Sequence, residues 1–228
     1  MTDAPTRPRT RLYLITPPQI ADLDEFSAQL EGALEAGDVA CLQLRLKQSD
    51  GETIDETATR AAAEALTPIA QAYGTAVIIN DSPELAVELG ADGVHVGITD
   101  RSVKETRAII GPDLILGATA KDSRHTAMTA GEQGADYVAF GAFYDTQTKA
   151  STVPADLSLL EFWQSVMELP CVAIGGITPD NAAPLVSAGA DFIAVSSSVW
   201  NAPSGAAMIV RAFNRIFDEL DTSAGEPS

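Results

Sequence analysis

Three polar side chains alternate with leucines between residues 42 and 47. Gln43, Arg45 and Lys47 stand two residues apart, each separated from the next by a leucine. Because successive side chains of a β-strand point to opposite faces, this spacing places the three polar groups on one face. Cations on the inner face of a closed sheet are costly to bury unless an anion meets them. The pattern therefore predicts an anion-binding site, with a solvated strand edge as the alternative.

Two aspartates follow later β-rich runs. Asp81 comes directly after Asn80, and Asp100 follows the next such run. Carboxylates from neighbouring strand ends are the hard oxygen ligands that Mg²⁺ prefers, together with substrate phosphates. The pair predicts a Mg²⁺ site; the alternative for Asp81 is that it only helps to start a helix.

A segment near residue 146 combines hydroxyls with a cation. Thr146, Thr148 and Lys149 lie within four residues of one another. Hydroxyl and ammonium groups bind phosphoryl oxygens, although these residue types are also common in surface loops that have no ligand. The segment is therefore a candidate phosphate-binding loop.

Small residues follow the last two β-rich runs. Gly176 belongs to a Gly-Gly pair, whose missing side chains permit close approach of a ligand to the backbone. Ser196 and Ser197 offer hydroxyls and backbone amides near a short helical segment. These residues predict a second phosphate site.

Imidazole and thiol groups are scarce. The chain has two histidines and two cysteines, so a zinc site built from them is not expected. Cys41 and Cys171 lie in apolar runs, which favours buried small hydrophobic residues over a disulfide or a thiol catalyst. For His95, inside a β-rich run, an acid–base role is open, but a hydrogen-bonded core histidine is favoured.

The elements that must position these residues repeat along the chain. An apolar helical segment, a glycine, often Ala-Asp, and then a β-rich run recur at Gly37, Gly90, Gly134 and Gly189. Glycine suits the left-handed residue that ends a helix. The repeats are roughly 50 residues apart, about the length of two strand–helix units.

Eight β-rich runs can be placed, each followed by a helical stretch. They lie near residues 12–16, 41–46, 76–79, 93–96, 114–118, 137–140, 172–175 and 192–195. This alternation predicts an α/β protein with a single (β/α)₈ TIM barrel domain over residues 11–221 and flexible tails at 1–10 and 222–228. An open doubly wound sheet is the alternative, but no Gly-x-Gly-x-x-Gly fingerprint follows the first run. In such barrels function lies in the loops after the strands, where the polar residues above fall.

Charge and hydropathy restrict the partners. The formal net charge of −18 would repel nucleic acid and anionic membrane surfaces, both of which bind clustered Lys and Arg. No stretch approaches the roughly 20 apolar residues of a membrane span, and the first apolar run is too short for a signal peptide. We therefore expect a soluble cytoplasmic protein that binds small molecules. Whether it forms a homo-oligomer is left open.

Five motifs occur in the order and spacing of a known family. They are QLRLK from residue 43, IND from residue 79, GVHVG from residue 93 with Asp100, TQTK from residue 146, and AIGGI from residue 173 with Asn181. Over about residues 12–200 the chain resembles the thiamine phosphate synthase family. The resemblance implies condensation of 4-amino-2-methyl-5-hydroxymethylpyrimidine diphosphate with 4-methyl-5-(2-phosphooxyethyl)thiazole, which gives thiamine phosphate and pyrophosphate.

The resemblance also implies a role for each candidate residue. Asp81 and Asp100 would hold Mg²⁺ on the pyrophosphate. The other assignments are Arg45, Lys47, Asn80 and Lys149 on the pyrophosphate oxygens, Gln43 at the pyrimidine, Thr146 and Thr148 beside the thiazole, and Gly176, Ser196 and Ser197 on the thiazole phosphate. Thr119 stands where the family commonly has serine and keeps its hydroxyl. The expected catalytic residues are Arg45, Lys47, Lys149 and Thr119.

Some positions depart from the family pattern. Ser82 replaces an arginine and Ile98 a glutamine beside the expected metal site, and Asp145 adds a negative charge before the loop at residue 146. These changes would lower turnover or alter the substrate. Two alternatives therefore stay open. One is a thiazole tautomerase-like enzyme, disfavoured because Lys121 stands where that family's histidine is expected. The other is a catalytically silent ligand-binding or regulatory barrel.

Overall fold

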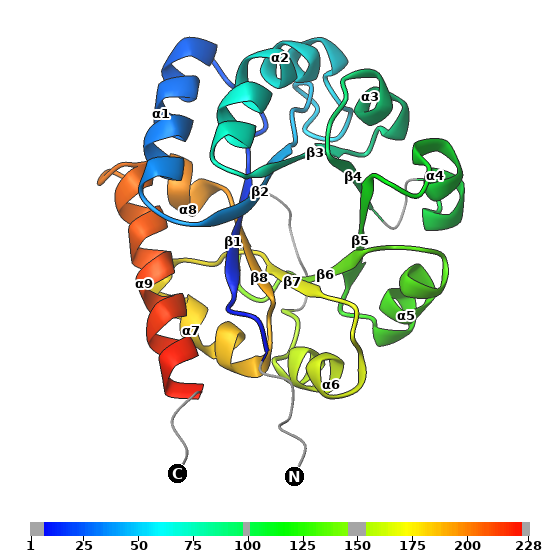
Figure 1. Cartoon of the computed structure of the whole chain (residues 1–228), viewed down its shortest axis with the longest axis vertical. Coiled ribbons are helices and arrows are strands. Elements are labelled where there is room, and N and C mark those ends of the chain that lie inside the picture. Colours follow the sequence, from blue (N-terminus) through cyan, green and yellow to red (C-terminus); the bar gives the residue numbers. More distant parts are fainter. Residues whose placement is uncertain (1–6, 98–100, 146–153, 225–228) are drawn as a thin grey trace.

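Eight parallel strands form a closed ring in the computed structural model, which describes residues 7–97, 101–145 and 154–224, with side chains up to residue 221. Each strand pairs with the next in chain order, and β1 pairs with β8 (Figure 1). The strands are β1 (Arg11–Ile15), β2 (Val39–Leu44), β3 (Ala76–Asn80), β4 (Gly93–Val96), β5 (Ile115–Lys121), β6 (Tyr137–Gly141), β7 (Cys171–Ile174) and β8 (Phe192–Val195). The predicted TIM barrel is confirmed.

Helices surround the ring on its outside (Figure 1). They are α1 (Leu23–Glu35), α2 (Glu56–Ala72), α3 (Pro83–Glu88), α4 (Val103–Ile110), α5 (Arg124–Glu132), α6 (Ser158–Val166), α7 (Pro179–Ala188), α8 (Ser197–Trp200) and α9 (Ala206–Ala224). The short α8 directly follows β8, whereas α9 packs against both α1 and α7 and completes the outer layer. No helix in the described part of the chain is long and apolar enough to cross a membrane.

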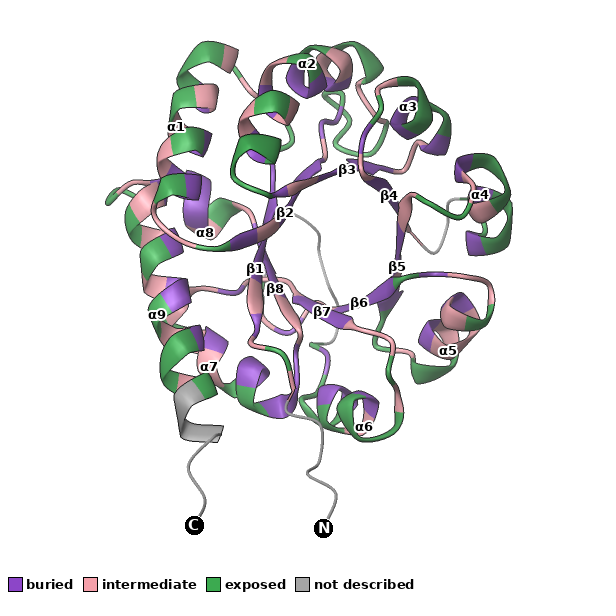
Figure 2. Cartoon of the chain, in the orientation of Figure 1, coloured by how far each residue is buried: buried purple, intermediate pink, exposed green. Residues whose placement is uncertain are grey.

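Both faces of the strands are buried, which Figure 2 shows as a mostly purple ring. The outward side chains join the inner faces of the helices in one large apolar core, where Phe140 packs against Trp163. The inward side chains form a second, smaller cluster that includes Tyr13, Ile78 and Tyr137. Period-two alternation of the strands accounts for this division. The barrel interior is therefore filled by side chains.

The aspartates of the repeated glycine-containing pattern hold the strands together at their amino-terminal ends. The carboxylate of Asp136 accepts the backbone N–H of Leu116 at 2.7 Å, and the N–H of Asp136 donates to the Leu116 carbonyl at 2.8 Å. Asp92 makes the same two bonds to Val77, and Asp191 makes them to Cys171. We call these three contacts the aspartate clamps. Each ties an even-numbered strand to the preceding odd-numbered one, which explains the recurrence of aspartate in the pattern.

The first occurrence of the pattern differs from the other three. Gly90, Gly134 and Gly189 have the positive φ angles that the pattern predicts. Gly37 instead makes room for α9, since a Cβ at this position would lie 2.5 Å from Nδ2 of Asn214. In place of a clamp, Asp38 accepts two hydrogen bonds from the guanidinium of Arg11, at 2.7 and 2.8 Å.

Strand β2 begins and ends two residues earlier than the sequence predicts. After Leu44 the backbone turns to new partners: Arg45 N–H donates to Oγ1 of Thr16 at 2.9 Å, and Lys47 N–H donates to the Pro18 carbonyl at 2.8 Å. Arg45 and Lys47 therefore follow the strand rather than lie inside it. Their alternation with the buried leucines nevertheless continues, because Leu46 is buried in the outer core.

Candidate active site

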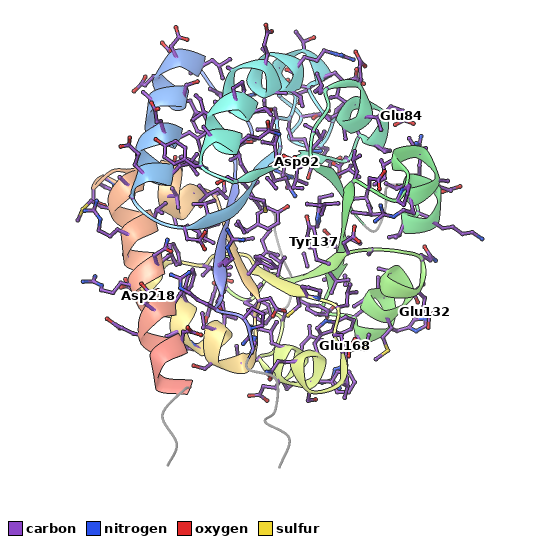
Figure 3. The ribbon with its side chains drawn as sticks, viewed as in Figure 1. Glu84, Asp92, Glu132, Tyr137, Glu168 and Asp218 are labelled. Atoms are coloured by element: carbon purple, nitrogen blue, oxygen red, sulfur yellow. The ribbon has the colours of Figure 1, made fainter. Side chains whose placement is uncertain are left out.

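The inner face of β2 places Gln43 inside the barrel. Its side chain is 3% exposed and donates from Nε2 to the Tyr13 hydroxyl at 2.8 Å. The Tyr13 hydroxyl lies 2.8 Å from that of Tyr137, whose side chain points into the ring in Figure 3. Burial raises the pKa values of both phenols well above their usual range, so both are neutral.

His95 continues this network toward the strand ends. Its Nδ1 lies 3.0 Å from the Tyr137 hydroxyl and its Nε2 lies 2.9 Å from Oγ1 of Thr119, on the neighbouring strand β5. Burial lowers the pKa of His95 to about 4, against an opposing effect of the Asp81 carboxylate. The prediction of a hydrogen-bonded core histidine is confirmed. Thr119 is half-buried and ends the network at the mouth of the barrel.

Lys47 and Asp81 form an ion pair at the carboxyl ends of β2 and β3. The Lys47 side chain is 5% exposed, and its Nζ lies 2.7 Å from Oδ2 of Asp81. The same Nζ donates to the backbone carbonyl of Glu52 at 2.8 Å. Such a buried ammonium is tolerable only because both partners are in place. The sequence-predicted anion-binding lysine and metal-binding aspartate are therefore adjacent.

Arg45 supplies a second cation beside this pair. The residue is partly buried, and burial lowers the pKa of its guanidinium while the Asp81 carboxylate raises it. Five donors fixed in a plane suit the oxygens of a phosphate. Two cations and one carboxylate from adjoining strand ends therefore form a site that fits an anion together with a metal ion.

The backbone at Asp81 has an unusual conformation. Asp81 has φ of 63° and donates its N–H to the His95 carbonyl at 2.8 Å. Left-handed backbone is uncommon for residues other than glycine and is frequent at functional sites. Asn80, the last residue of β3, is 5% exposed and precedes this turn. Local geometry therefore aims the Asp81 carboxylate at Lys47 rather than along the strand.

In the described part of the chain, one carboxylate at this site is available to bind a metal ion. The side chain of Asp81 is 23% exposed, so one carboxylate reaches the mouth of the barrel. Asp100, the second expected ligand, lies outside the described residues. Within residues 7–97, 101–145 and 154–221 no group of three or more His, Cys, Asp or Glu side chains could hold a metal. The donor set fits Mg²⁺, which takes few protein ligands and completes its shell with phosphate oxygens and water.

The loop after β6 is described as far as Asp145. Thr146, Thr148 and Lys149 lie outside the described residues, as does Ile98. The described part of the loop pairs with the loop after β7, because Tyr144 N–H donates to the Gly175 carbonyl at 3.1 Å. The structure thus places the start of the predicted phosphate-binding loop beside the Gly-Gly pair.

Gly176 makes close contact with this same loop. It has φ of 64°, and a Cβ would lie 2.3 Å from the Asp145 carbonyl oxygen. Gly175 is equally restricted, because a Cβ there would lie 2.3 Å from Cβ of Ala142. The close approach that the two glycines permit in this structure is between loops. Binding of a phosphate by Gly176 stays a prediction.

Ser196 and Ser197 lie where β8 meets α8, close to the end of β1. Ser196 Oγ donates to the Thr16 carbonyl at 3.2 Å, whereas Ser197 is exposed. The indole of Trp200 donates to the Ile15 carbonyl at 2.6 Å and holds α8 against β1. The two serines thus directly follow β8, where the sequence predicts a phosphate site.

Among the described positions that depart from the family pattern, Ser82 has a structural role. Ser82 is the N-cap of α3, and its Oγ accepts the N–H of Leu85 at 3.3 Å. Lys121 ends β5 with φ of 54° and is exposed. Ser82 therefore caps a helix, and Lys121 contributes no buried acid–base group.

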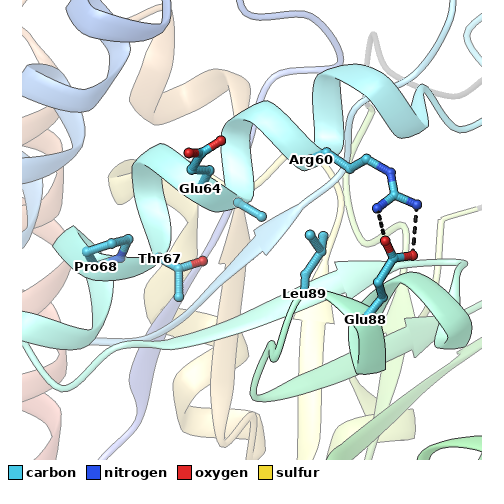
Figure 4. Close-up of a pocket in the computed structure, with 7 residues that line it drawn as sticks. Arg60, Glu64, Thr67, Pro68, Glu88 and Leu89 are labelled. Atoms are coloured by element: carbon cyan, nitrogen blue, oxygen red, sulfur yellow. Dashed lines mark hydrogen bonds and ion pairs between the residues drawn. The ribbon is translucent and has the colours of Figure 1, made fainter.

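The hollow shown in Figure 4 is on the outer helical layer. It lies between α2 and α3, and the guanidinium of Arg60 pairs across it with the carboxylate of Glu88. None of its lining residues is a candidate from the sequence. The chemistry of the strand ends is therefore separate from this surface.

Tyr13 and Tyr137 are not among the candidates from the sequence. Both occupy inward positions of their strands, and alternation with the neighbouring apolar residues is the signal that could have found them. Alternation does not indicate that the two hydroxyls contact each other, because β1 and β6 are not adjacent in the ring.

Comparison with known proteins gives consistent matches over the barrel. A family model described as thiamine monophosphate synthase matches residues 12–199. A thiamine-phosphate synthase of Hyphomonas neptunium is 65% identical over 221 residues, which cover 96% of this chain and 100% of that protein. One of Rhodospirillum centenum is 54% identical over 206 residues, 90% of this chain and 97% of that protein. A solved structure of thiamine phosphate pyrophosphorylase from Pyrococcus furiosus has a TM-score of 0.78 and 28% identity, and covers 92% of this chain and 96% of that one.

Proposed function

The chain belongs to the thiamine monophosphate synthase family, and from this premise we propose that it joins 4-amino-2-methyl-5-hydroxymethylpyrimidine diphosphate to 4-methyl-5-(2-phosphooxyethyl)thiazole. The products are thiamine phosphate and pyrophosphate. The protein is thus a transferase that acts on two small-molecule substrates. Its cytoplasmic location and its state of association stay predictions from the sequence.

One observation supports this function above the others: two partly or fully buried cations meet a carboxylate at the strand ends. Lys47 is 5% exposed and paired with Asp81, and Arg45 lies beside them, its pKa affected by the same carboxylate. A site of this kind is matched to a diphosphate, whose charge compensates for burial of the cations.

The chain's own groups have simple tasks in this reaction. The bond between the methylene carbon and the diphosphate oxygen breaks, the pyrophosphate leaves with the electron pair, and the thiazole nitrogen forms the new bond to carbon. Arg45 and Lys47 neutralise the charge that develops on the leaving oxygens. Gln43, from inside the barrel, orients the pyrimidine, whose amino group stabilises the electron-poor methylene carbon. This division of tasks needs no nucleophilic side chain.

We further propose that the reaction requires Mg²⁺, held by Asp81 and Asp100. When bound, the ion supplies positive charge to the oxygens of the diphosphate. Asp81 is suited to this task because its carboxylate is partly exposed at the mouth of the barrel. Lys149, Thr146 and Thr148 are proposed to contact the two substrates from the loop after β6, and Ser196, Ser197 and Gly176 to bind the thiazole phosphate.

Release of pyrophosphate tests the proposal directly. With both substrates and Mg²⁺, the protein is expected to release one pyrophosphate for each thiamine phosphate formed, and Asp81→Asn to lower the rate at least 100-fold, roughly the effect of losing one electrostatic contact to the reacting group. Asp113→Asn is the matched control, because Asp113 is exposed in the turn before β5, at the opposite end of the barrel. Binding of the pyrimidine diphosphate without any pyrophosphate release would instead support a ligand-binding barrel.

A further inference from the structure

A continuous chain of polar side chains crosses the interior of the barrel. It runs from Gln43 through Tyr13, Tyr137 and His95 to Thr119, with contact distances of 2.8, 2.8, 3.0 and 2.9 Å. The first four side chains are 3 to 8% exposed, whereas Thr119 is half-buried at the mouth. A buried hydrogen-bonded chain of this kind acts as a unit, so its orientation is a property of all its members.

Gln43, at the inner end of this chain of polar side chains, sets the direction in which its hydrogen bonds run. A side-chain amide nitrogen can only donate, so the Tyr13 hydroxyl accepts the bond from Gln43. The single hydrogen of Tyr13 then needs an acceptor of its own. The oxygen of Tyr137 lies at 2.8 Å, and the other group nearby is the thiol of Cys41, whose sulfur is a weak acceptor. Tyr13 therefore donates to Tyr137.

The direction then passes to the histidine. Because Tyr137 accepts from Tyr13, its own hydrogen points to Nδ1 of His95. A ring nitrogen that accepts carries no proton, so the neutral imidazole holds its proton on Nε2 and donates it to Thr119. The opposite direction would leave the Tyr13 hydrogen buried without an oxygen acceptor, which is the costly arrangement.

We propose that Tyr137 and His95 are positioning residues that fix the Thr119 hydroxyl as a donor toward the pyrimidine diphosphate. Since Oγ1 of Thr119 accepts from His95, the one hydrogen of this hydroxyl is free to point into the mouth, where it meets an acceptor atom of that substrate. This inference rests on the proposed function for the identity of the substrate. The orientation itself is a property of the substrate-free protein.

The packing around these polar side chains holds Tyr137 and His95 in place. The rings of His95 and Tyr137 are stacked, with their centroids 5.6 Å apart and an interplanar angle of 29°. Gly117 of β5 provides the space, because a Cβ there would lie 2.0 Å from Cζ of Tyr137 and 2.6 Å from Nδ1 of His95. Any side chain at this position would push the two groups apart.

Nitrogen NMR of the histidine side chains tests the direction without reference to activity. The chain has two histidines, and His125 is exposed on α5, so the two signals can be assigned by replacing one residue. The expected result is a proton on Nε2 of His95 and none on Nδ1 in the substrate-free protein. A proton on Nδ1 would overturn the proposal, because Thr119 would then donate to His95 and could only accept from the substrate.

Two matched variants separate positioning from simple packing. Tyr137→Phe removes the donor to Nδ1, so His95 is expected to lose its fixed proton position and kcat to fall about tenfold, with the KM for the thiazole phosphate unchanged. Tyr13→Phe removes an equally buried hydroxyl. Nδ1 of His95 is then the described acceptor that remains for the buried Tyr137 hydrogen, so the direction of that bond and the Nε2 proton are expected to stay. Tyr73→Phe, at an exposed tyrosine bonded to Glu35, is the surface control.

The outcomes remain distinguishable from failure of the proposed function. A lower kcat in Tyr137→Phe with an unchanged proton position on His95 would overturn the positioning role and leave a packing effect. The expected proton position in a wild-type protein that releases no pyrophosphate would refute the proposed reaction while leaving the direction of the chain intact. If Tyr137→Phe does not fold, the wild-type proton position still decides the direction.

Discussion

Adding a single methyl group at Gly117 is expected to destabilise the barrel and disable the site together. In Gly117→Ala the new Cβ would lie 2.0 Å from Cζ and 2.2 Å from the hydroxyl oxygen of Tyr137, whereas carbon atoms in contact are normally about 3.5 Å apart or more. Tyr137 is 7% exposed, so the ring has little room to withdraw. Overpacking costs about 1–3 kcal/mol, and loss of the two Tyr137 hydrogen bonds adds about 1 kcal/mol each. We expect a total of about 3–5 kcal/mol.

Urea unfolding followed by circular dichroism measures this loss, and pyrophosphate release measures the accompanying loss of activity. Gly32→Ala is the matched control: Gly32 lies inside α1 with nothing within 4 Å of the added Cβ, so the same substitution should stabilise by up to about 1 kcal/mol. In a Tyr137→Leu background the two nearest clashing atoms, Cζ and the hydroxyl oxygen of Tyr137, are gone, while Nδ1 of His95 stays 2.6 Å away, so the cost of Gly117→Ala should shrink but not vanish. Equal costs in both backgrounds would refute the account of the clash.

Four further outcomes are expected. Asp136→Ala removes the acceptor of the Leu116 amide and should lower the free energy of unfolding by about 1–3 kcal/mol in urea titrations; a change below about 0.5 kcal/mol would show that the clamp is not needed. The pKa of His95 is lowered from 6.5 to about 4 in the folded protein, so unfolding takes up a proton between these pH values. The free energy of unfolding of the metal-free protein should therefore fall by up to about 3 kcal/mol as the pH falls from 6.5 to about 4, and in His95→Gln this fall should be missing. Lys47→Met should lower kcat/KM at least about 100-fold, and Lys104→Met, at an exposed position on α4, should leave it unchanged. Removal of metal with EDTA should stop pyrophosphate release without changing the circular dichroism spectrum, and added Mg²⁺ should restore it; activity that persists in EDTA would count against the metal.

The elements that could be predicted from the sequence are those whose signals are local. Strands β4 and β8 have the predicted limits, because each is a short apolar run bounded by a polar or glycine-containing turn. The start of α3 was also predictable, since Ser82 and Pro83 supply the cap and the first-turn proline that the structure shows. These features need no information from distant parts of the chain.

Features that depend on distant contacts were not predictable in this way. Strand β2 ends early because Thr16 and Pro18, from the segment after β1, take the backbone hydrogen bonds of Arg45 and Lys47. The polar chain across the interior exists only when the ring closes and brings β1 and β6 face to face. For the site, the pairing of Lys47 with Asp81 follows from strand order, whereas the direction of the Thr119 hydroxyl does not.

The aspartate clamps are missing between β1 and β2, which makes this strand pair respond differently to salt. In three of the four odd–even strand pairs, an aspartate carboxylate accepts the backbone N–H of the neighbouring strand. Because the amide carries no net charge, dissolved salt screens this contact less than it screens an ion pair. The β1–β2 pair relies instead on Arg11 and Asp38, whose side chains are each 43% exposed. Dissolved salt screens an exposed pair of this kind. The β1–β2 pair is thus the strand pair whose stability depends most on salt. Rising ionic strength should weaken the barrel first beside β1, where the N-terminal segment joins the ring.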